Sequence, residues 1–171
     1  LAKPEKIPHL KPAFREGGTV TAANSSSISD GAAALSLASR AAVTAHNLDV
    51  QAQICGHAGF AHAPGWFTTA PIFAARKLLK KLGWQASDVD IWEVNEAFAV
   101  VAMAFIRELE IDPEHVNIHG GACALGHPIG ASGARILVSL LNALKQSDGR
   151  KGLAAICLGG GEGIAVAVEA A

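Results

Sequence analysis

The chain has 171 residues, of which 50% are hydrophobic and 17% charged, and its formal net charge is −1. Disordered chains have the opposite composition, so these values indicate one folded domain, or one domain with part of another. The near-zero charge gives no electrostatic footprint for nucleic acid or for an anionic membrane surface, and we expect neither as a partner. The three cysteines are an odd number in apolar surroundings, which favours a reducing compartment, the cytoplasm or an organelle matrix.

The first residue is Leu1 rather than Met, which suggests a piece cut from a longer protein. Residues 1–14 carry lysines and prolines before any apolar run, unlike a secretory signal. Residues 50–75 lack Asp, Glu, Lys and Arg, but they contain glutamines, histidines and prolines whose polar groups a bilayer would leave unsatisfied. We therefore expect no membrane span.

The first third of the chain predicts few regular elements. Residues 1–18 are rich in Pro and Lys and are expected to form an extended surface segment or linker. Ser29 is a candidate N-cap for a helix over residues 31–46, in which small apolar residues recur on one face. Residues 50–60 alternate weakly between apolar and polar types, which predicts a strand.

The rest of the chain predicts strands that alternate with helices. Thr68 and Thr69 followed by Pro71 are typical of a helix start, and this helix is expected to run to Leu82. The following elements are expected in order: strand 90–94, helix 97–109, strand 116–118, helix 131–145, and strands 153–158 and 164–169. This alternation, with two adjacent strands at the end, predicts an α/β fold with a mixed β-sheet covered by helices.

Three segments place a reactive side chain at a strand end, beside a helix start or a glycine turn. Asn95 follows the first of these strands, His127 lies in a glycine-rich loop just before Pro128, and Cys157 precedes the glycines 159–161. Pro128 keeps His127 out of helical conformation, which fixes the approach of its ring. Ligands and catalytic groups of α/β sheets collect at such strand ends, so the three residues are candidate catalytic residues.

Each candidate also has a purely structural interpretation. Asn95 can cap the helix that follows it, His127 can be used only for hydrogen bonds within its loop, and Cys157 can be a small core residue. The spacing of His115, His119 and Cys123 would suit a metal ion on a helix, but the intervening residues predict a strand and a glycine turn. The sequence has no phosphate-binding loop, and its final glycine turn lacks the dinucleotide-binding spacing.

Together these segments resemble the thiolase family of acyl-CoA C-acyltransferases. The resemblance is carried by residues 18–35, by Asn95-Glu96-Ala97-Phe98, by residues 117–137 and by Cys-Leu-Gly-Gly-Gly at 157–161. It implies a layered α/β fold in which residues 1–67 are the tail of the family's N-terminal half and residues 68–171 are its C-terminal domain. The strand at 50–60 would then pair with sheet that lies outside this chain.

The resemblance also implies a reaction, the condensation of two acetyl-CoA to acetoacetyl-CoA and CoA, or the reverse thiolysis. His127 matches the residue that activates the nucleophile and binds the thioester oxygen, and Asn95 matches the one that holds a water in the same oxyanion hole. Cys157 matches the acid in cleavage and the base in condensation. The N–H of Gly159 matches part of a second oxyanion hole, and Phe67 stands where some thiolases have Met beside the acyl pocket.

The sequence departs from the family at the nucleophile. The nucleophilic cysteine lies in the family's N-terminal half, before Ser-Gly, and no such segment occurs here. We therefore expect an inactive C-terminal portion whose partners are the missing half, acetyl-CoA or acetoacetyl-CoA, and further copies in a homo-oligomer, with no cofactor beyond the coenzyme A thioester as substrate. Two alternatives remain open, a non-catalytic interaction module and a hydrolase that uses Cys157, His127 and Asn95 as a Cys-His-Asn triad.

Overall fold

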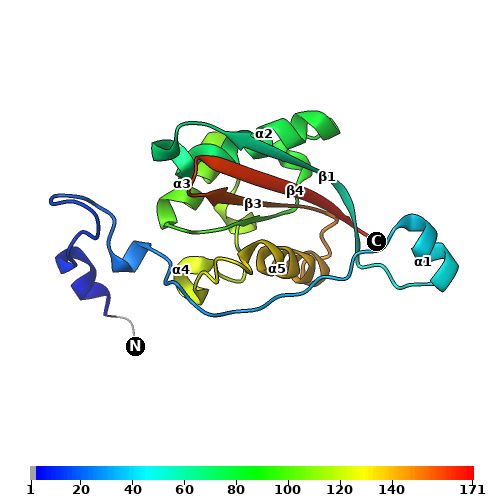
Figure 1. Cartoon of the computed structure of the whole chain (residues 1–171), viewed down its shortest axis with the longest axis horizontal. Helices are drawn as coiled ribbons and strands as arrows, with labels where there is room; N and C mark the ends of the chain where they lie inside the picture. The colour runs from blue at the N-terminus through cyan, green and yellow to red at the C-terminus, as the bar shows by residue number, and fades with distance from the viewer. Residues whose placement is uncertain (1–2) are drawn as a thin grey trace.

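The computed structural model describes residues 3–171, and its centre is a four-stranded mixed sheet (Figure 1). Its strands, in chain order, are β1 (Ala52–Ala61), β2 (Ile91–Val94), β3 (Lys151–Leu158) and β4 (Glu162–Ala170). In space the order is β1-β4-β3-β2, with β2 parallel to β3 and β4 antiparallel to both of its neighbours. The mixed sheet predicted from the alternating elements is therefore confirmed.

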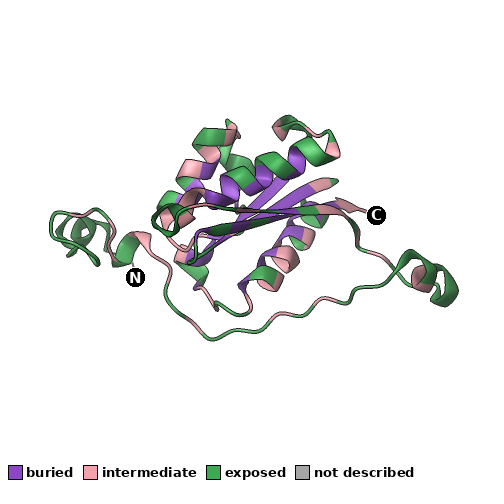
Figure 2. Cartoon of the chain, turned by 45° about the horizontal axis from the view of Figure 1, so that its top comes forward, coloured by how far each residue is buried: buried purple, intermediate pink, exposed green. Residues whose placement is uncertain are grey.

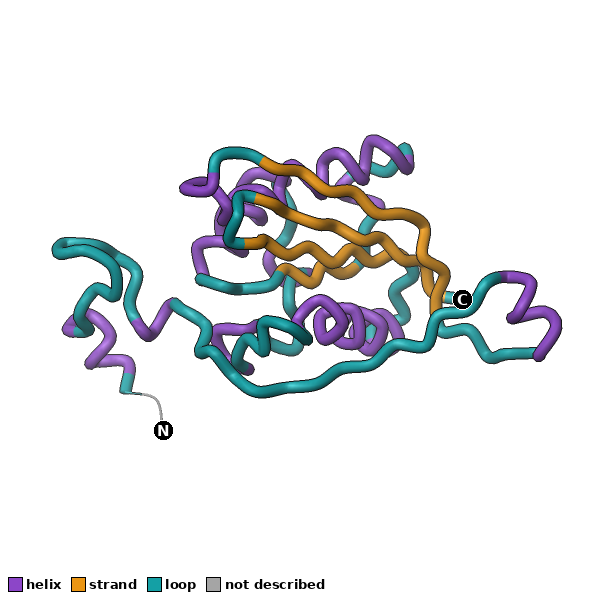
Figure 3. The backbone as a smooth tube through the Cα atoms, viewed as in Figure 1, coloured by secondary structure: helices purple, strands orange, loops and turns teal. Residues whose placement is uncertain are grey.

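Helices cover both faces of this sheet (Figure 3). The α-helices of the chain are α1 (Arg40–His46), α2 (Ala70–Leu82), α3 (Ala99–Leu109), α4 (Ala122–Leu125) and α5 (Ser132–Gln146), of which α1 lies apart from the sheet. α2 and α3 lie on one face, and the buried side chains there include Leu78, Trp92 and Phe105. α5 lies on the other face, where Ile136 and Leu140 pack against the strands. Figure 2 shows that the buried residues concentrate in the strands and in the helix sides that face them.

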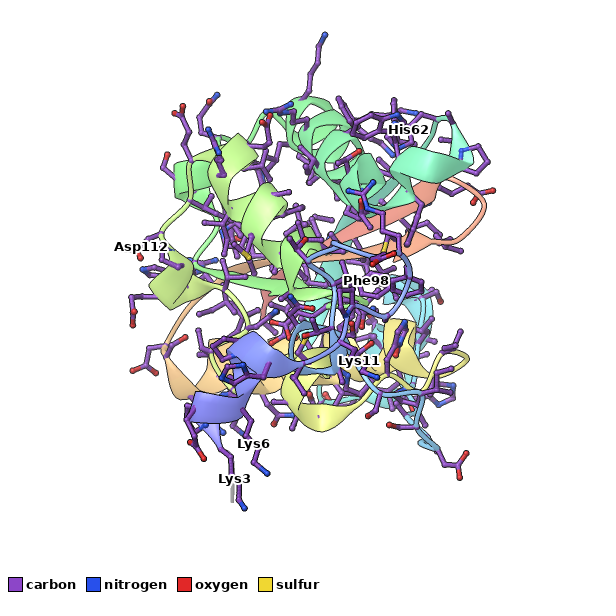
Figure 4. All side chains as sticks on the ribbon, turned by 90° about the vertical axis from the view of Figure 1, so that its left-hand side faces the viewer. Lys3, Lys6, Lys11, His62, Phe98 and Asp112 are labelled. Carbon is purple, nitrogen blue, oxygen red and sulfur yellow. The ribbon has the colours of Figure 1, made fainter. Side chains whose placement is uncertain are left out.

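The residues before β1 run along the outside of this layered body. The chain from residue 10 to residue 39 is mostly extended, and its contacts with the body lie near residues 25–31. Phe14 also packs edge-to-face against Phe98, with ring centroids 5.7 Å apart, and Phe98 lies under this segment in Figure 4. We call residues 25–31 the strap.

The predicted helix over residues 31–46 is wrong for its first nine residues. Residues 31–39 are extended and mostly exposed, and α1 begins only at Arg40. Ser39, rather than Ser29, is the N-cap, since its hydroxyl accepts from the N–H of Ala42 at 3.2 Å. Residues 31–38 are mostly alanine and leucine and suit a helix, but no surface of the described chain buries a helical face here, so packing does not select the helix.

The predicted strand over residues 116–118 is also wrong. Val116 makes only an isolated parallel bridge to Trp92, and Asn117 then takes a left-handed conformation with φ of 50°. The side-chain amide of Asn117 replaces further backbone pairing, because it accepts from the N–H of Val94 at 2.8 Å and donates to the carbonyl of Val94 at 2.9 Å. The outer edge of β2 is thus paired by the backbone at Trp92 and by the side chain of Asn117 at Val94.

The start of α2 is confirmed within two residues, but its predicted cap is not. The Thr69 hydroxyl donates to the carbonyl of Trp66 at 2.9 Å and caps no helical N–H. The 3-10 helix Pro64–Thr69 leads directly into α2 instead, with Pro71 in the first turn as predicted. Gly83, at φ of 68°, ends the helix in the left-handed conformation that glycine adopts without strain.

β1 pairs with β4 along its whole length, so the expectation that it pairs with sheet outside the chain is wrong. Its other edge carries two lysines from α2. Lys77 donates to the carbonyl of Gly59 at 3.1 Å, and Lys81 donates to that of His57 at 3.5 Å. Charged groups on a free edge oppose pairing with another chain.

We therefore expect the double substitution Lys77→Ala and Lys81→Ala to increase self-association, because it frees two edge carbonyls and removes two positive charges. The cost in folding stability should be about 1 kcal/mol or less, since these bonds are exposed. Light scattering as a function of concentration measures the association. Lys80→Ala, on an exposed site of the same helix, is the matched control. Equal association of the double variant and the control would contradict this role.

Candidate active site

Asn95 is placed by the parallel pairing of β2 with β3. Its N–H donates to the carbonyl of Ala155 at 2.9 Å, and its side chain is fully buried. The side-chain Nδ2 donates to Nε2 of His127 at 3.2 Å. The capping interpretation is wrong, because Phe98 is the N-cap residue of α3 and Oδ1 of Asn95 accepts no hydrogen bond from the helix N–H groups. The carboxamide therefore points to the histidine.

His127 lies in the loop between α4 and α5, and both of its ring nitrogens have partners. Nδ1 lies 2.6 Å from the hydroxyl of Ser132, which is itself fully buried in the first turn of α5. The single hydroxyl proton of Ser132 goes to the carbonyl of Pro128 at 3.0 Å. With the hydroxyl proton directed to Pro128, we assign a proton to Nδ1, which it donates to Ser132, and a lone pair to Nε2, which receives the amide of Asn95.

The strap fixes the loop that carries this histidine. The backbone N–H of His127 donates to the carbonyl of Ser27 at 2.9 Å, and Ile28 forms a parallel bridge with His127. Gly126 has φ of 92°, and a Cβ there would lie only 2.3 Å from the hydroxyl oxygen of Ser29. A residue other than glycine at position 126 would be strained at this φ, and its Cβ would crowd the side chain of Ser29 in the strap.

The pKa of His127 lies below its ordinary value. Burial is the main cause, because it disfavours the charged imidazolium, and the positive charge of Arg135 adds to it. An uncharged imidazole with its proton on Nδ1 is the form that can take a proton at Nε2. The site is thus built to present a base.

Cys157 lies near the carboxyl end of β3 and is 8% exposed. Its neighbours in the core belong to the face covered by α2 and α3. Burial raises the pKa of its thiol to about 11, so the group carries its proton at neutral pH. Parallel pairing puts Cys157 at the same sheet edge as Asn95, but no hydrogen bond in the described chain joins it to Asn95 or His127.

Gly159 lies in the turn between β3 and β4 and is exposed. A Cβ built at this position meets nothing within 4 Å. Within residues 3–171, its N–H takes part in none of the backbone hydrogen bonds outside the regular elements. The position is therefore open to a ligand approaching the backbone.

Two polar residues near the site, Glu96 and Ser132, were not predicted from the sequence to have a role there. The carboxylate of Glu96 accepts from Nδ2 of Asn117 at 2.8 Å and from the N–H of Cys123 at 3.1 Å, which fixes the start of α4 beside β2. Gly121 leaves room for this carboxylate, since a Cβ there would overlap it. Ser132 is the second of these residues. Its position at the start of a helix, five residues after His127, is the only sign in the sequence that the two side chains can meet.

A buried ion pair, Glu93 with Arg135, lies beside the site and was also not predicted. Glu93 is 1% exposed, and one of its carboxylate oxygens lies 3.9 Å from an Nη of Arg135. Burial raises the pKa of Glu93 to about 7. The positive charge of Arg135 lowers this pKa by a smaller amount, and the negative charge of Glu96 adds to the increase. This carboxyl therefore takes up a proton near neutral pH.

Family models match nearly the whole chain. The model of the thiolase C-terminal domain matches residues 48–170, and the model of the thiolase N-terminal domain matches residues 2–41. The chain belongs to the thiolase family.

Relatives within this family are acetyl-CoA acetyltransferases. The chain is 53% identical over 165 residues to acetyl-CoA acetyltransferase 1 of Arabidopsis thaliana, and 48% identical over 168 residues to a probable acetyl-CoA acetyltransferase of Escherichia coli. These matches cover 96% and 98% of the chain but only 40% and 43% of the relatives. The chain thus spans about two fifths of the length of these thiolases.

Solved thiolase structures have the same fold. The acetyl-CoA acetyltransferase of Bacillus anthracis matches with a TM-score of 0.95 at 44% identity, covering 98% of this chain and 42% of that one. The Acat5 thiolase of Ascaris suum, solved with coenzyme A, matches with a TM-score of 0.91 at 45% identity, covering 99% of this chain and 44% of that one. The thiolase fold expected from the motifs is confirmed.

Two other kinds of feature are absent from residues 3–171. None of the described helices is long and apolar enough to cross a bilayer. In the same part of the chain, no three His, Cys, Asp or Glu side chains are grouped so that they could bind a metal ion.

Ser132→Ala should destabilise the fold by about 1–3 kcal/mol, because it leaves the buried Nδ1–H of His127 without an acceptor. Urea unfolding monitored by circular dichroism measures the change. Ser87→Ala removes an exposed hydroxyl without a partner and is the matched control. A loss no larger than that of the control would show that the Ser132 contact does not hold the imidazole.

Glu93→Gln should remove a pH-dependent cost of folding. A carboxyl whose pKa rises from 4.5 to about 7 on folding gives stability below pH 4.5 that is lost as pH rises through 7. The free energy of unfolding of the native chain should therefore fall, relative to that of the glutamine variant, by roughly 3 kcal/mol between pH 4.5 and pH 8. Urea titrations across this range measure the difference.

Glu114→Gln, at an exposed carboxylate, is the control for this pH series and should follow the native chain. The difference in free energy of unfolding between the native chain and Glu93→Gln should change with pH. A difference that stays constant would contradict a raised pKa at Glu93.

Proposed function

We propose that this chain supplies one half of the active site of an acetyl-CoA acetyltransferase, which condenses two acetyl-CoA to acetoacetyl-CoA and CoA or catalyses the reverse thiolysis. The observation that carries the proposal is the hydrogen-bonded series Asn95–His127–Ser132, at the sheet edge that also holds Cys157. The acetyl-CoA acetyltransferase relatives and the coenzyme A bound by the Ascaris thiolase support the substrate class.

In this proposal His127 is the general base for a nucleophilic cysteine on the other half of the enzyme. Its neutral Nε2 takes the thiol proton, and in condensation the thiolate attacks the thioester carbon of the first acetyl-CoA. The Nε2–H formed in this way can then donate a hydrogen bond to the thioester oxygen as negative charge develops there. Coenzyme A leaves when the carbonyl forms again, and its thiolate takes the proton from Nε2. The lowered pKa of His127 and the proton on Nδ1 suit this role, and the amide of Asn95 supplies a second donor at the same place.

Cys157 is the second thiol of the proposed reaction. Because burial raises its pKa to about 11, it holds a proton that it can give to the α-carbon of the departing enolate during thiolysis. In condensation the same sulfur takes the α-proton, which requires it to be ionised in the assembled site. In this proposal the N–H of Gly159, two residues further on, donates to the enolate oxygen, and the open space around this glycine supports that role.

The nucleophile must come from a segment outside this sequence, since no Cys-x-Ser-Gly occurs in it. The proposed partners are therefore a thiolase N-terminal half, the acetyl-CoA and acetoacetyl-CoA substrates, and further copies in a homo-oligomer. No cofactor is needed for this chemistry. The division into residues 1–67 and 68–171 stays a prediction, and so does a cytoplasmic or organelle-matrix location. The match to the C-terminal family model begins at residue 48 and includes β1.

The geometry disfavours the alternative Cys-His-Asn hydrolase. Such a triad needs one imidazole nitrogen on the thiol, whereas no hydrogen bond joins Cys157 to His127 within residues 3–171 and Cys157 belongs to the core under α2 and α3. The non-catalytic module remains the second candidate, because the strap and the sheet edge would serve assembly as well as chemistry.

Co-expression of this chain with a thiolase N-terminal half that carries Cys-x-Ser-Gly tests the proposal. Thiolysis of acetoacetyl-CoA should be absent with either half alone and present with both. His127→Ala and Cys157→Ala should each lower kcat by at least about a hundredfold, the range expected for an acid–base group.

His119→Ala and Cys55→Ser are the matched controls, since His119 is exposed and Cys55 lies on β1 away from the β2 and β3 ends. Both should keep nearly full activity. Assembly of the two halves with coenzyme A binding but no turnover would favour the non-catalytic module instead.

A further inference from the structure

The interface between β2 and α5 holds an unusual group of polar atoms. In residues 3–171, the buried side-chain nitrogen and oxygen atoms without a hydrogen-bond partner are both carboxylate oxygens of Glu93, Oδ1 of Asn95 and Nε of Arg135. Buried polar groups are nearly always paired, so a concentration of unpaired ones in one place calls for an explanation.

These atoms lie directly behind the histidine. Ile91 packs against α5 whereas Trp92 and Val94 face α2 and α3, so strand alternation turns Glu93 towards α5. Asn95 reaches His127 two residues further along. On α5, Arg135 follows Ser132 by three residues, nearly one helical turn, so the two side chains lie on the same side of the helix.

We propose that Arg135 is a positioning residue that holds the His127 imidazole in its uncharged form, and that Glu93 controls this effect by neutralising the guanidinium when ionised and releasing it when protonated. This inference rests on the proposed function only for its biological purpose, because an uncharged imidazole is needed if His127 takes a proton from a thiol. The physical coupling itself belongs to this chain and is measurable without turnover.

The charges around this group are few. Glu93 faces Arg135 from α5 and Glu96 from the segment after β2, and its pairing partner on β3 is the apolar Ala154. His127 is influenced by Arg135, whereas its hydrogen-bond partners Asn95 and Ser132 are uncharged. The charge of Arg135 thus acts on both the carboxyl of Glu93 and the imidazole of His127.

The direction of the coupling follows from these charges. Above pH 7 Glu93 is ionised and offsets the charge of Arg135, and the imidazole is neutral in any case. As pH falls through about 7 Glu93 takes up a proton, so the positive charge of Arg135 acts on His127 without compensation. The carboxyl therefore accepts the proton first, and the imidazole stays neutral to lower pH than it would without Arg135.

Ring signals of His127, followed by NMR against pH in this chain, test the inference. The native protein should show a small step near pH 7, from Glu93, and a larger one at lower pH, from the imidazole itself. Arg135→Gln should shift the larger step to higher pH. Arg135→Lys should restore its position, because it keeps the charge without the guanidinium shape. Arg107→Gln, at an exposed site on α3, is the control and should shift neither step.

Glu93→Gln, which keeps the side-chain shape, should abolish the step near pH 7 and leave the imidazole step low. An unshifted imidazole step in Arg135→Gln would overturn the proposal. If that variant does not fold, the same His127 titration curve in the native chain and in Glu93→Gln would overturn it. In the reassembled enzyme, the acid limb of kcat/KM should move to higher pH in Arg135→Gln. Active enzyme with unshifted titrations would reject this inference alone, whereas shifted titrations without activity would reject only the proposed function.

Discussion

The site depends on the parallel pairing of β2 with β3. Parallel strands bring their carboxyl ends to one edge, so this pairing places Asn95 and Cys157 there although 62 positions separate them in the sequence. β2 has only four residues, and on its outer side the side chain of Asn117 replaces a neighbouring strand. A short strand held by a strand on one side and by an amide on the other thus positions the polar side chains of the site.

The sequence predicts most of the regular elements because their apolar periods are clear and their ends carry recognisable signals. α2 has Pro71 in its first turn and Gly83 after its last, and β3 and β4 are apolar runs around a glycine turn. The errors occur where packing decides. Residues 31–39 suit a helix but meet no surface of the described chain that would bury its face, and Asn117 ends a strand pattern with a side-chain bond that no local periodicity shows.

The candidate site divides in the same way. Asn95 and Cys157 can be found from the sequence because each stands near a strand end beside a turn, and His127 because it lies between glycines and directly before Pro128. Their roles cannot be found from the sequence. The tautomer of His127 depends on Ser132, and the charge of its imidazole depends on Arg135 and on the carboxyl of Glu93. These contacts join β2 to the start of α5, and they exist only once the sheet and the helix pack together.

The mechanism depends on a proton on Nδ1 of His127, because only then is Nε2 unprotonated, with a lone pair that receives the amide of Asn95 and can take a proton. Nitrogen NMR of the ¹⁵N-labelled imidazole at neutral pH measures it directly. We expect a protonated Nδ1 that donates a hydrogen bond to the Ser132 hydroxyl, and an unprotonated Nε2. A protonated Nε2 with a free Nδ1 would contradict the account, since Asn95 would then receive the histidine proton and His127 could not take one from a thiol at that atom.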